Sequence, residues 1–173
     1  NPRKAGIIAI AIDEGDTLIG VALTDGKHDV MLFSDEGKAV RFDEEDVRPL
    51  GRDARGVRGM NLAKGGKVIS MLVAEDEQLS VLTATENGYG KRTAITEYTR
   101  HGRGTKGMIA IQTSERNGKV VAAVLVDERD VTGLARALLG FIDHPAIVES
   151  FGAAGRAFVE APFSIDRQAA GLG

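Results

Sequence analysis

The sequence contains no cysteine and no tryptophan, and only four prolines, among its 173 residues. Without cysteine the chain can form no disulfide, has no thiol nucleophile and offers no thiolate ligand to zinc. No apolar run approaches the ~18 residues of a membrane span. Residues 1–12 hold one apolar patch that lacks the anatomy of a signal peptide. We therefore expect a soluble, cytoplasmic protein with no membrane partner.

Glycine is abundant, with 22 residues, which indicates many tight turns between short strands. The sequence also repeats itself. Residues 30–32 align with residues 81–83, and residues 67–69 align with residues 119–121. Residues 6–10 align with residues 107–111 as part of a third, partial copy. Residues 4–130 therefore hold about two and a half units of ~50 residues.

Each unit predicts four short strands. In the first unit they are residues 18–23, 29–34, 38–42 and 58–62, and in the second unit residues 68–73, 79–85, 90–95 and 108–112. Asp25-Gly26, Glu36-Gly37 and Asn87-Gly88 supply turns of the kind that tight hairpins need. Four strands in ~50 residues are typical of a blade of a propeller, so the predicted fold class is mainly β with propeller-like blades.

The repeat stops near residue 130. Residues 131–142 and 147–158 instead carry apolar residues at helical spacing, among them Leu134, Leu138, Phe151 and Phe158. We expect two parts: blades over residues 1–130, and a helical tail over residues 131–173 that packs on them. The third unit begins at residues 120–126 and is incomplete, so the tail could cover its open edge in the same chain or in a second chain of a homo-oligomer.

No enzyme chemistry is evident. The three histidines, His28, His101 and His144, share no metal-ligand spacing, and no nucleophile lies beside an obvious base. The glycine-lysine pairs lack the remaining residues of a phosphate-binding loop. We predict no catalytic residue, no metal site and no cofactor.

Charge is segregated along the chain although the net charge is only −3. Residues 13–46 hold eleven acidic and three basic residues, residues 48–67 hold six basic and one acidic, and residues 89–119 hold seven basic and two acidic. Segregation of this kind can make one face of a molecule positive.

The cations recur with the repeat. Equivalent loops of successive blades emerge at equivalent edges, so their cations would form a curved track suited to the phosphate backbone of duplex DNA, read by shape rather than by sequence. From spacing alone, these loops could equally be plain connectors with solvated arginines. The candidate DNA-binding residues are Arg52, Arg55, Arg58, Lys91, Arg92, Arg100, Arg103 and Lys106.

Four stretches carry a resemblance to a known family: H-D-V-M-L-F-S at 28–34, N-G-Y-G-K-R-T-A at 87–94, T-K-G at 105–107 and S-E-R-N-G at 114–118. Together they resemble the C-terminal domain of the gyrase A proteins over about residues 4–130, and the related topoisomerase IV protein more weakly. The resemblance implies a β-pinwheel of four-stranded blades that binds and bends duplex DNA around its basic rim. It also implies the remainder of DNA gyrase, an ATP-dependent type II topoisomerase, as a partner, and a nucleoid-associated location.

Two departures from that family qualify what it implies. The family's wrapping signature, Q-R-R-G-G-K-G, has only a degenerate counterpart at residues 101–107, so we expect weak bending rather than full wrapping. The cleavage domain is absent from the sequence, so the chain by itself should be non-catalytic.

The tail is a further departure. Residues 131–168 are similar to the final helices of retaining GT-B glycosyltransferases, without that family's catalytic residues, which would make this a hybrid or engineered chain. The alternatives to DNA binding are a blade-repeat scaffold that binds protein, an engineered chimera without useful DNA affinity, and glycosyl transfer.

Overall fold

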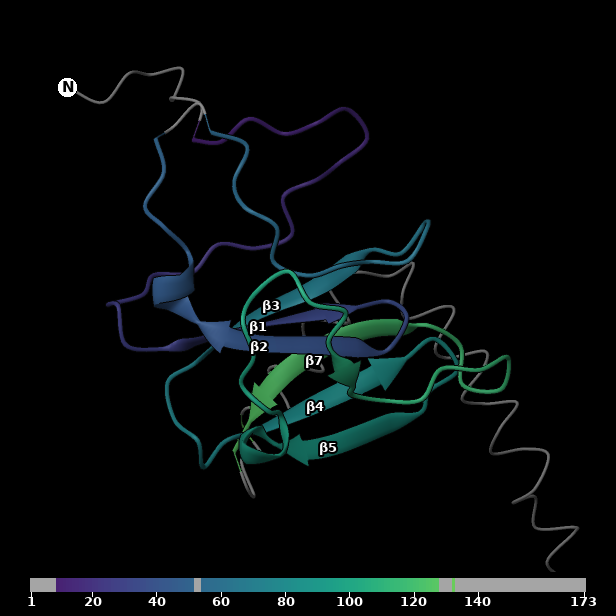
Figure 1. Cartoon of the computed structure of the whole chain (residues 1–173). Helices are drawn as coiled ribbons and strands as arrows, with labels where there is room; N and C mark the ends of the chain where they lie inside the picture. Colours follow the sequence, from purple (N-terminus) through teal and green to yellow (C-terminus); the bar gives the residue numbers. More distant parts are fainter. Residues whose placement is uncertain (1–8, 52–53, 128–131, 133–173) are drawn as a thin grey trace, which may run out of the picture.

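The computed structural model describes residues 9–51, 54–127 and 132. They form two antiparallel sheets (Figure 1), which confirms the predicted mainly β fold. The elements are β1 (Asp29–Ser34), β2 (Lys38–Asp43), η1 (Glu44–Asp46), β3 (Val68–Ala74), β4 (Ser80–Thr85), β5 (Gly90–Ala94), η2 (Ile95–Glu97), β6 (Met108–Ile109) and β7 (Val120–Val126). Within the described residues no helix is long and apolar enough to cross a membrane. The predicted helices of residues 131–161 lie outside the described part, Thr132 excepted.

The two units build two equivalent hairpins. β1 pairs with β2 and β4 pairs with β5, so that Met31 lies opposite Arg41 and Leu82 lies opposite Arg92. Both hairpins turn at a glycine with φ of 78°, Gly37 or Gly88, as the turn sequences predict. The repeat of about 51 residues is therefore a repeat of hairpins.

Each hairpin is joined by the strand that follows it. β3 pairs with β1 and β7 pairs with β4. The acidic residue of each turn fixes this strand: Asp35 Oδ1 accepts from the backbone N–H of Lys67 at 2.9 Å, and Glu86 Oε2 accepts from that of Lys119 at 2.8 Å. These two strands lie at the inner sides of the sheets, where the sheets meet.

The strands of one sheet come from both units. The first sheet has the order β3-β1-β2-β6, so two of its strands belong to the second unit, and the second sheet has the order β5-β4-β7. The prediction that each unit supplies its own four strands is wrong. Residues 18–23 form no strand, and of residues 58–62 only Met60 makes an isolated bridge, to Thr105. Residues 18–23 have no strand partner among the described residues, and residues 59–61 bond to the loop at residues 104–105 instead of to a sheet.

The main apolar core lies between the two sheets. Met31 and Phe33 of β1 project toward Val81 of β4, and the ring of Tyr98 meets Phe33 edge-on at 5.8 Å. A second cluster on the opposite face of the first sheet contains Val40, Phe42 and Met60. Because both faces of β1 are covered, its apolar residues are consecutive rather than alternating, as is typical of a strand in a stacked blade.

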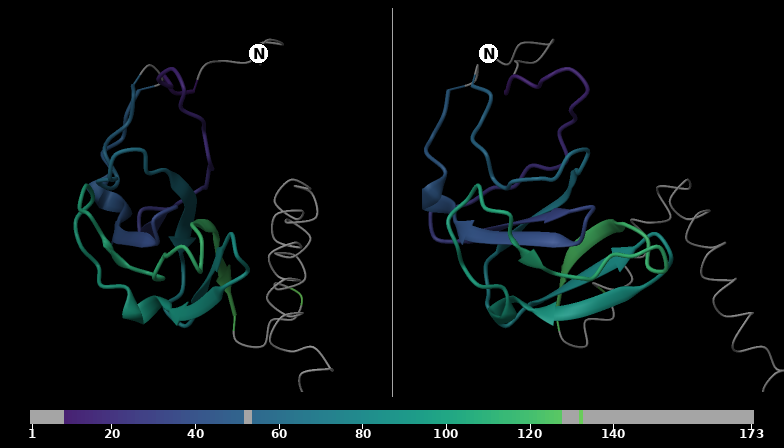
Figure 2. Two further views of the ribbon diagram at one scale, coloured as in Figure 1. Left: turned by 90° about the vertical axis from the view of Figure 1, so that its right-hand side faces the viewer. Right: turned by 45° about the vertical axis from the view of Figure 1, so that its right-hand side comes forward.

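Long loops extend from one side of these sheets. Residues 9–25, purple in Figures 1 and 2, and the connection between η1 and β3 both project away from the strands on the same side. The connection from η2 to β6 instead runs along the first sheet: the backbone N–H of His101 donates to the carbonyl of Arg41 at 2.8 Å. These connections carry most of the predicted DNA-binding residues.

Candidate nucleic-acid interface

Two basic loops that occupy equivalent positions in the sequence repeat, around Arg58 and around Arg103, lie side by side. The backbone N–H of Asn61 donates to the carbonyl of Thr105 at 2.8 Å, and that of Gly104 donates to the carbonyl of Gly59. Met60 and Thr105 form a parallel bridge between them. The main chain therefore holds residues 58–61 against residues 103–105, although 45 positions separate Arg58 from Arg103.

This pairing brings together three exposed cations, Arg58, Arg103 and Lys106, here called the rim cluster. Arg103 is held by carbonyl oxygens: its Nε donates to Asp46 O at 2.9 Å and its Nη1 to Arg58 O at 3.2 Å. Carbonyl partners orient the guanidinium without neutralising it. The rim cluster therefore keeps its positive charge, as a phosphate-binding surface requires.

Gly107 sets the position of the second loop. Its φ is +70°, and a Cβ on it would lie 2.3 Å from the carbonyl oxygen of Ala39 in β2. Only glycine allows the chain to approach β2 this closely before it pairs as β6. The glycine in the Thr-Lys-Gly sequence thus allows β6 to pair with β2, and this pairing fixes the position of the adjacent Lys106.

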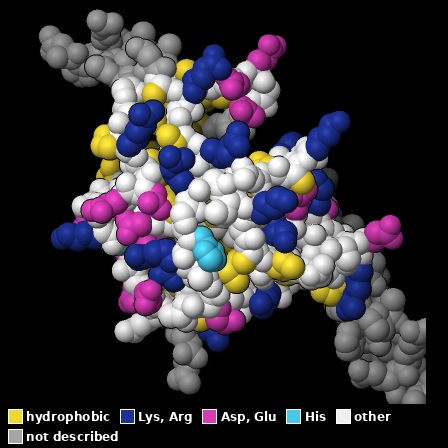
Figure 3. Space-filling view, in the orientation of Figure 1, with side chains coloured by type: hydrophobic (Ala, Val, Ile, Leu, Met, Phe, Trp, Pro, Cys, Tyr) yellow, Lys and Arg dark blue, Asp and Glu magenta, His cyan; other side chains and the backbone are white. Residues whose placement is uncertain are grey.

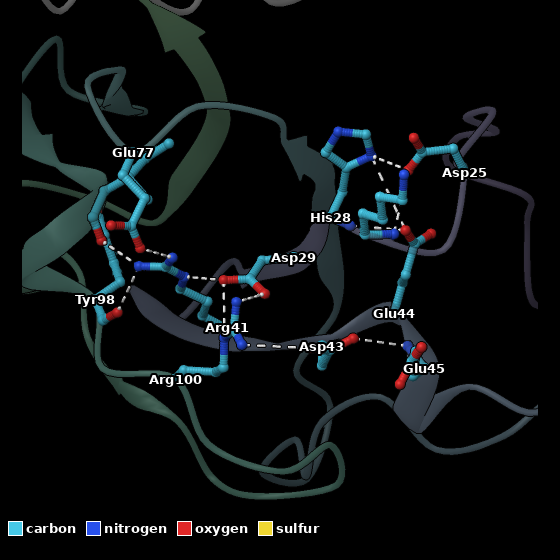
Figure 4. Close-up of polar contacts among 12 residues, drawn as sticks. Asp25, His28, Asp29, Arg41, Asp43, Glu44, Glu45, Glu77, Tyr98 and Arg100 are labelled. Atoms are coloured by element: carbon cyan, nitrogen blue, oxygen red, sulfur yellow. Dashed lines mark hydrogen bonds and ion pairs between the residues drawn. The ribbon is translucent and has the colours of Figure 1, made fainter.

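Two other predicted residues are paired with carboxylates. Arg55 Nη1 lies 2.6 Å from Asp13 Oδ1, with both side chains exposed. Arg100 Nη2 lies 2.6 Å from Asp29 Oδ1, and its Nη1 lies 3.3 Å from Asp43 Oδ2 (Figure 4). A phosphate would have to compete with these partners. Arg52 lies outside the described residues.

Lys91 and Arg92 are both exposed on β5, the outer strand of the second sheet. Lys91 lies opposite Thr83 and Arg92 lies opposite Leu82, so the two side chains leave opposite faces of the sheet. Neither has an ion-pair partner within the described residues. They lie on the second sheet, whereas the rim cluster lies along the edge of the first.

Arg92 has a counterpart in the first sheet, and that counterpart is structural. Arg41 is buried, with its Nε against Asp29 and its Nη2 2.7 Å from Glu77 Oε1 (Figure 4). Its Nη1 donates to the carbonyls of Ile95 and Tyr98. Burial alone would lower the pKa of Arg41, but its bonds to Glu77 and Asp29 outweigh this and raise it. Arg41 therefore ties the first sheet to the second as a permanent cation.

Arg116 is a cation that sequence reasoning missed. Its guanidinium carbon lies 4.9 Å from the ring centre of Tyr89, and its Nε donates to Tyr89 Oη at 2.8 Å. The side chain of Asn87 donates to the carbonyl of Arg116 at 2.8 Å and so joins the two turns. The sequence places an Asn-Gly turn near each residue, but only the register shows that the turns meet. Stacking holds this exposed cation in one orientation.

Asp25, His28 and Glu44 also come together, although the sequence predicted no metal site. Their ligand atoms lie within 4.8 Å of one another, and His28 Nδ1 is 3.0 Å from Asp25 Oδ1 (Figure 4). Glu44 accepts from the backbone N–H of His28 at 2.7 Å. Its pKa lies below the usual value, first because the Thr24 side chain donates to it and then because of that N–H. Hydrogen bonds that fix the loop before β1 thus explain the cluster.

The centre of the face in Figure 3 is mainly basic, whereas its margins also carry acidic side chains. In Figure 3, Lys and Arg side chains spread over the centre and upper part of the face, and Asp and Glu side chains gather at its left edge and in a second group at the top. Lys119 joins the two sheets, with its Nζ 2.6 Å from Asp35 Oδ2. The net negative charge of the chain is compatible with a locally positive edge.

The sequence of these repeats identifies the family to which the chain belongs. The model of the family described as "DNA gyrase C-terminal domain, beta-propeller" matches residues 1–25, 28–75 and 80–127. The chain belongs to this family. The first matched segment holds residues 9–25, the second holds the β1–β2 hairpin with β3, and the third holds the β4–β5 hairpin with β7.

Relatives among known proteins are gyrase A proteins. The chain is 58% identical to the DNA gyrase A protein of Klebsiella oxytoca over 129 residues, which are 75% of this chain and 15% of that protein. It is 55% identical to the Escherichia coli gyrase A protein over 128 residues, which are 74% of this chain and 14% of that one. The matched part of this chain thus spans about a seventh of the length of these relatives.

Solved structures agree on the fold. The chain matches a gyrase A C-terminal domain with a TM-score of 0.65 and 31% identity, covering 72% of this chain and 43% of that one. It matches the C-terminal domain of DNA topoisomerase IV with the same TM-score and 29% identity, covering 69% of this chain and 37% of that one. The predicted β-pinwheel is confirmed. The resemblance of residues 131–168 to glycosyltransferase helices finds no support, and the family match ends at residue 127.

Proposed function

We propose that this chain binds duplex DNA through the rim cluster and bends it weakly. The observation that carries the proposal is the pairing of the two basic loops, which gathers Arg58, Arg103 and Lys106 at one edge. Lys91, Arg92 and Arg116 are additional exposed cations that the same duplex could reach. Arg52, Arg55 and Arg100 also belong to the proposed surface. Arg55 and Arg100 should contribute less to DNA affinity than the rim cluster, because they are paired with carboxylates.

Binding of this kind is electrostatic and tolerant of sequence. The proposed contacts are guanidinium and ammonium groups on glycine-rich loops, which suit phosphates rather than base edges. If about five cations meet phosphates, log K falls with log salt at a slope of roughly −4 to −5. Residues 1–130 would form the DNA-binding part, and the tail of residues 131–173 would pack on it.

The proposal includes a context for the domain. The chain would act as the non-catalytic DNA-binding part of a type II topoisomerase, with the remainder of gyrase as its partner, in the cytoplasm on the nucleoid. By itself it should leave the linking number of closed circular DNA unchanged with ATP and magnesium present. Any relaxation or cleavage by the isolated chain would contradict this assignment.

A titration tests DNA binding. Affinity is measured on two unrelated duplexes over a salt series, with wild type and with the double variant Arg103→Ala, Lys106→Ala. The variant should lower the affinity for both duplexes alike, and the slope of log K against log salt should become shallower by about 2. The control double variant Lys27→Ala, Lys38→Ala should change little, because those lysines belong to the acidic segment of residues 13–46. Binding that is independent of salt, or absent at low salt, would refute the proposal.

A role in protein association is the second candidate. The observation that favours it is an exposed apolar stretch, residues 18–23, that has no strand partner among the described residues. Self-association of the chain is the form of this role that we propose. It does not exclude DNA binding, because the stretch contains none of the predicted DNA-binding residues.

A further inference from the structure

The hydrogen bonds around the loop before β1 leave one nitrogen atom unexplained. His28 Nδ1 lies 3.0 Å from Asp25 Oδ1 and 3.9 Å from Glu44 Oε1, and the ligand atoms of the three residues lie within 4.8 Å of one another (Figure 4). The hydrogen bonds described above account for the position of Glu44. They do not involve His28 Nδ1, which is buried and has no hydrogen-bond partner.

That nitrogen requires a cation beside it. Nδ1 of an imidazole whose proton is on Nε2 has a lone pair, and carboxylate oxygens also offer only lone pairs. Atoms of this kind repel one another at these distances unless a proton or a metal ion lies among them. A proton on Nδ1 would be expected to form a hydrogen bond, and Asp25 Oδ1 is near enough for one, yet none forms. A metal ion could instead bind the nitrogen and both carboxylates at once.

The main chain holds these groups in place before any ion binds. Asp29 and Asp43 pair across β1 and β2, so His28 and Glu44 meet at the open end of the hairpin. The backbone N–H of His28 donates to Glu44 Oε1 at 2.7 Å, and the backbone N–H of Glu44 donates to the carbonyl of His28 at 3.1 Å. Asp25 Oδ1 accepts from the backbone N–H of Lys27 at 3.1 Å. Outer hydrogen bonds of this kind orient the ligands in metal sites.

The surroundings and the ligand types indicate which ion fits. A hollow of about 360 Å³ adjoins Glu44 and is also lined by Thr24, Gly26 and Glu45. An ion held by one nitrogen and two carboxylates fills its remaining positions with water, which this hollow can admit. Imidazole together with carboxylates suits Zn²⁺ and neighbouring transition metals, whereas Mg²⁺ and Ca²⁺ prefer oxygen ligands alone.

We propose that Asp25, His28 and Glu44 bind a divalent transition-metal ion such as Zn²⁺, with His28 Nδ1 as the nitrogen ligand. The sequence could not indicate this site, because His28 and Glu44 are 16 positions apart and meet only when the hairpin forms. The ion would fasten the loop before β1 to η1. None of the three ligands belongs to the rim cluster, so this proposal does not depend on DNA binding.

Calorimetric titration of the full chain with Zn²⁺ alone, without DNA, tests the inference. Wild type should bind a single zinc ion with a dissociation constant in the micromolar range. His28→Ala should bind it about 100-fold more weakly or worse, because losing a ligand costs more than losing one of its outer partners. His101→Ala and His144→Ala, which remove the other two histidines of the chain, should bind zinc as wild type does.

Further measurements identify the ligand atom and the kind of ion. In ¹⁵N NMR the Nδ1 resonance of His28 should shift when Zn²⁺ is added, while Nε2 keeps its proton. Mg²⁺ in large excess should not displace the zinc, because a nitrogen ligand favours the transition metal. Zn²⁺ should raise the Tm of wild type and leave that of His28→Ala unchanged, since an ion that binds only the folded chain stabilises it.

Four results would overturn the proposal. A wild-type chain that binds no Zn²⁺ would leave His28 as an ordinary ion-pair partner of the carboxylates. Equal loss of zinc binding in His28→Ala and His101→Ala would place the ion elsewhere, and displacement by Mg²⁺ would indicate an acidic patch without preference among cations. If His28→Ala does not fold, Asp25→Asn serves instead: it keeps an oxygen but loses the charge, and an unchanged zinc affinity in this variant would also overturn the site.

Discussion

Arg41 and Arg92 occupy the same position in two copies of one hairpin, yet they have opposite environments. Arg41 is buried against Asp29, Glu77 and two carbonyls, while Arg92 is exposed. In the register, Ser80 stands where the first hairpin has Asp29. The repeat therefore contains a matched pair in which one arginine binds the next sheet and the other is available to a partner.

That pair makes a controlled prediction about stability. Arg41→Ala removes one partner of a buried ion pair and leaves Asp29 partly uncompensated, so the free energy of unfolding should fall by about 3 kcal/mol. Arg92→Ala should lower it by about 0.5 kcal/mol or less, as surface substitutions usually do. Urea unfolding of both variants measures the difference. Equal losses would show that Arg41 does not join the sheets.

Asp35 predicts a dependence on acid. Burial by itself would raise its pKa, but the bond from Lys119 and the N–H of Lys67 lower it overall. A carboxyl whose pKa is lower in the folded chain contributes stability above its unfolded pKa of about 3.9, and loses it as the pH falls through the folded value. Unfolding in urea from pH 6 to pH 3 should therefore show a weaker pH dependence for Asp35→Asn than for wild type. Glu14→Gln, an exposed control, should retain the wild-type dependence.

At the scale of the elements, the two hairpins could be predicted from the sequence and their neighbours could not. Apolar strands around Glu36-Gly37 and Asn87-Gly88 specify hairpins locally. Which strand joins a hairpin depends on contacts between distant residues, such as β6 with β2. Residues 18–23 show the limit of a pattern, because the same sequence type is a strand only where a hairpin edge is present. The repeat showed that the two basic loops are equivalent, but not that their main chains pair directly.

The ion-pair partners of the cations could not be predicted from the sequence either. Arg100 and Asp29 are 71 positions apart, and nothing in the composition of either segment indicates that they meet. Arg41 lies in a strand that reads as half-exposed, so its burial could not be foreseen. The sequence identifies which residues are basic, whereas the register decides which of them remain available.

β6 depends on a single glycine. A Cβ at Gly107 would meet the Ala39 carbonyl at 2.3 Å, whereas one at Gly65, which also has a positive φ, would meet nothing within 4 Å. Gly65→Ala should lower the free energy of unfolding by about 1 kcal/mol through backbone strain alone. Gly107→Ala adds a steric clash worth about 1–3 kcal/mol and should lower it by at least twice as much. Amide exchange at Met108 and Ile109 should rise only in the second variant.

At the scale of the whole molecule, DNA affinity depends on a balance between the basic edge and the acidic segment. Asp13 neutralises Arg55 at 2.6 Å. Asp13→Asn removes that partner and one negative charge, so DNA affinity at low salt should rise roughly threefold and the salt slope should steepen by up to about 0.9. Glu75→Gln, at an exposed position just after β3, is the control for a change of net charge alone. If both variants raise affinity equally, Arg55 has no particular part in binding.

The exchange of strands between units also determines how the protein unfolds. In a simple repeat protein each unit contacts only its neighbours, and unfolding can begin at one end and spread. Here the first sheet is complete only when β6, which follows the second hairpin, returns to β2. Neither unit can therefore be melted, cut away or expressed alone without removing strands from the other. The described blades should lose their structure in a single cooperative step, despite a sequence that divides so readily into copies.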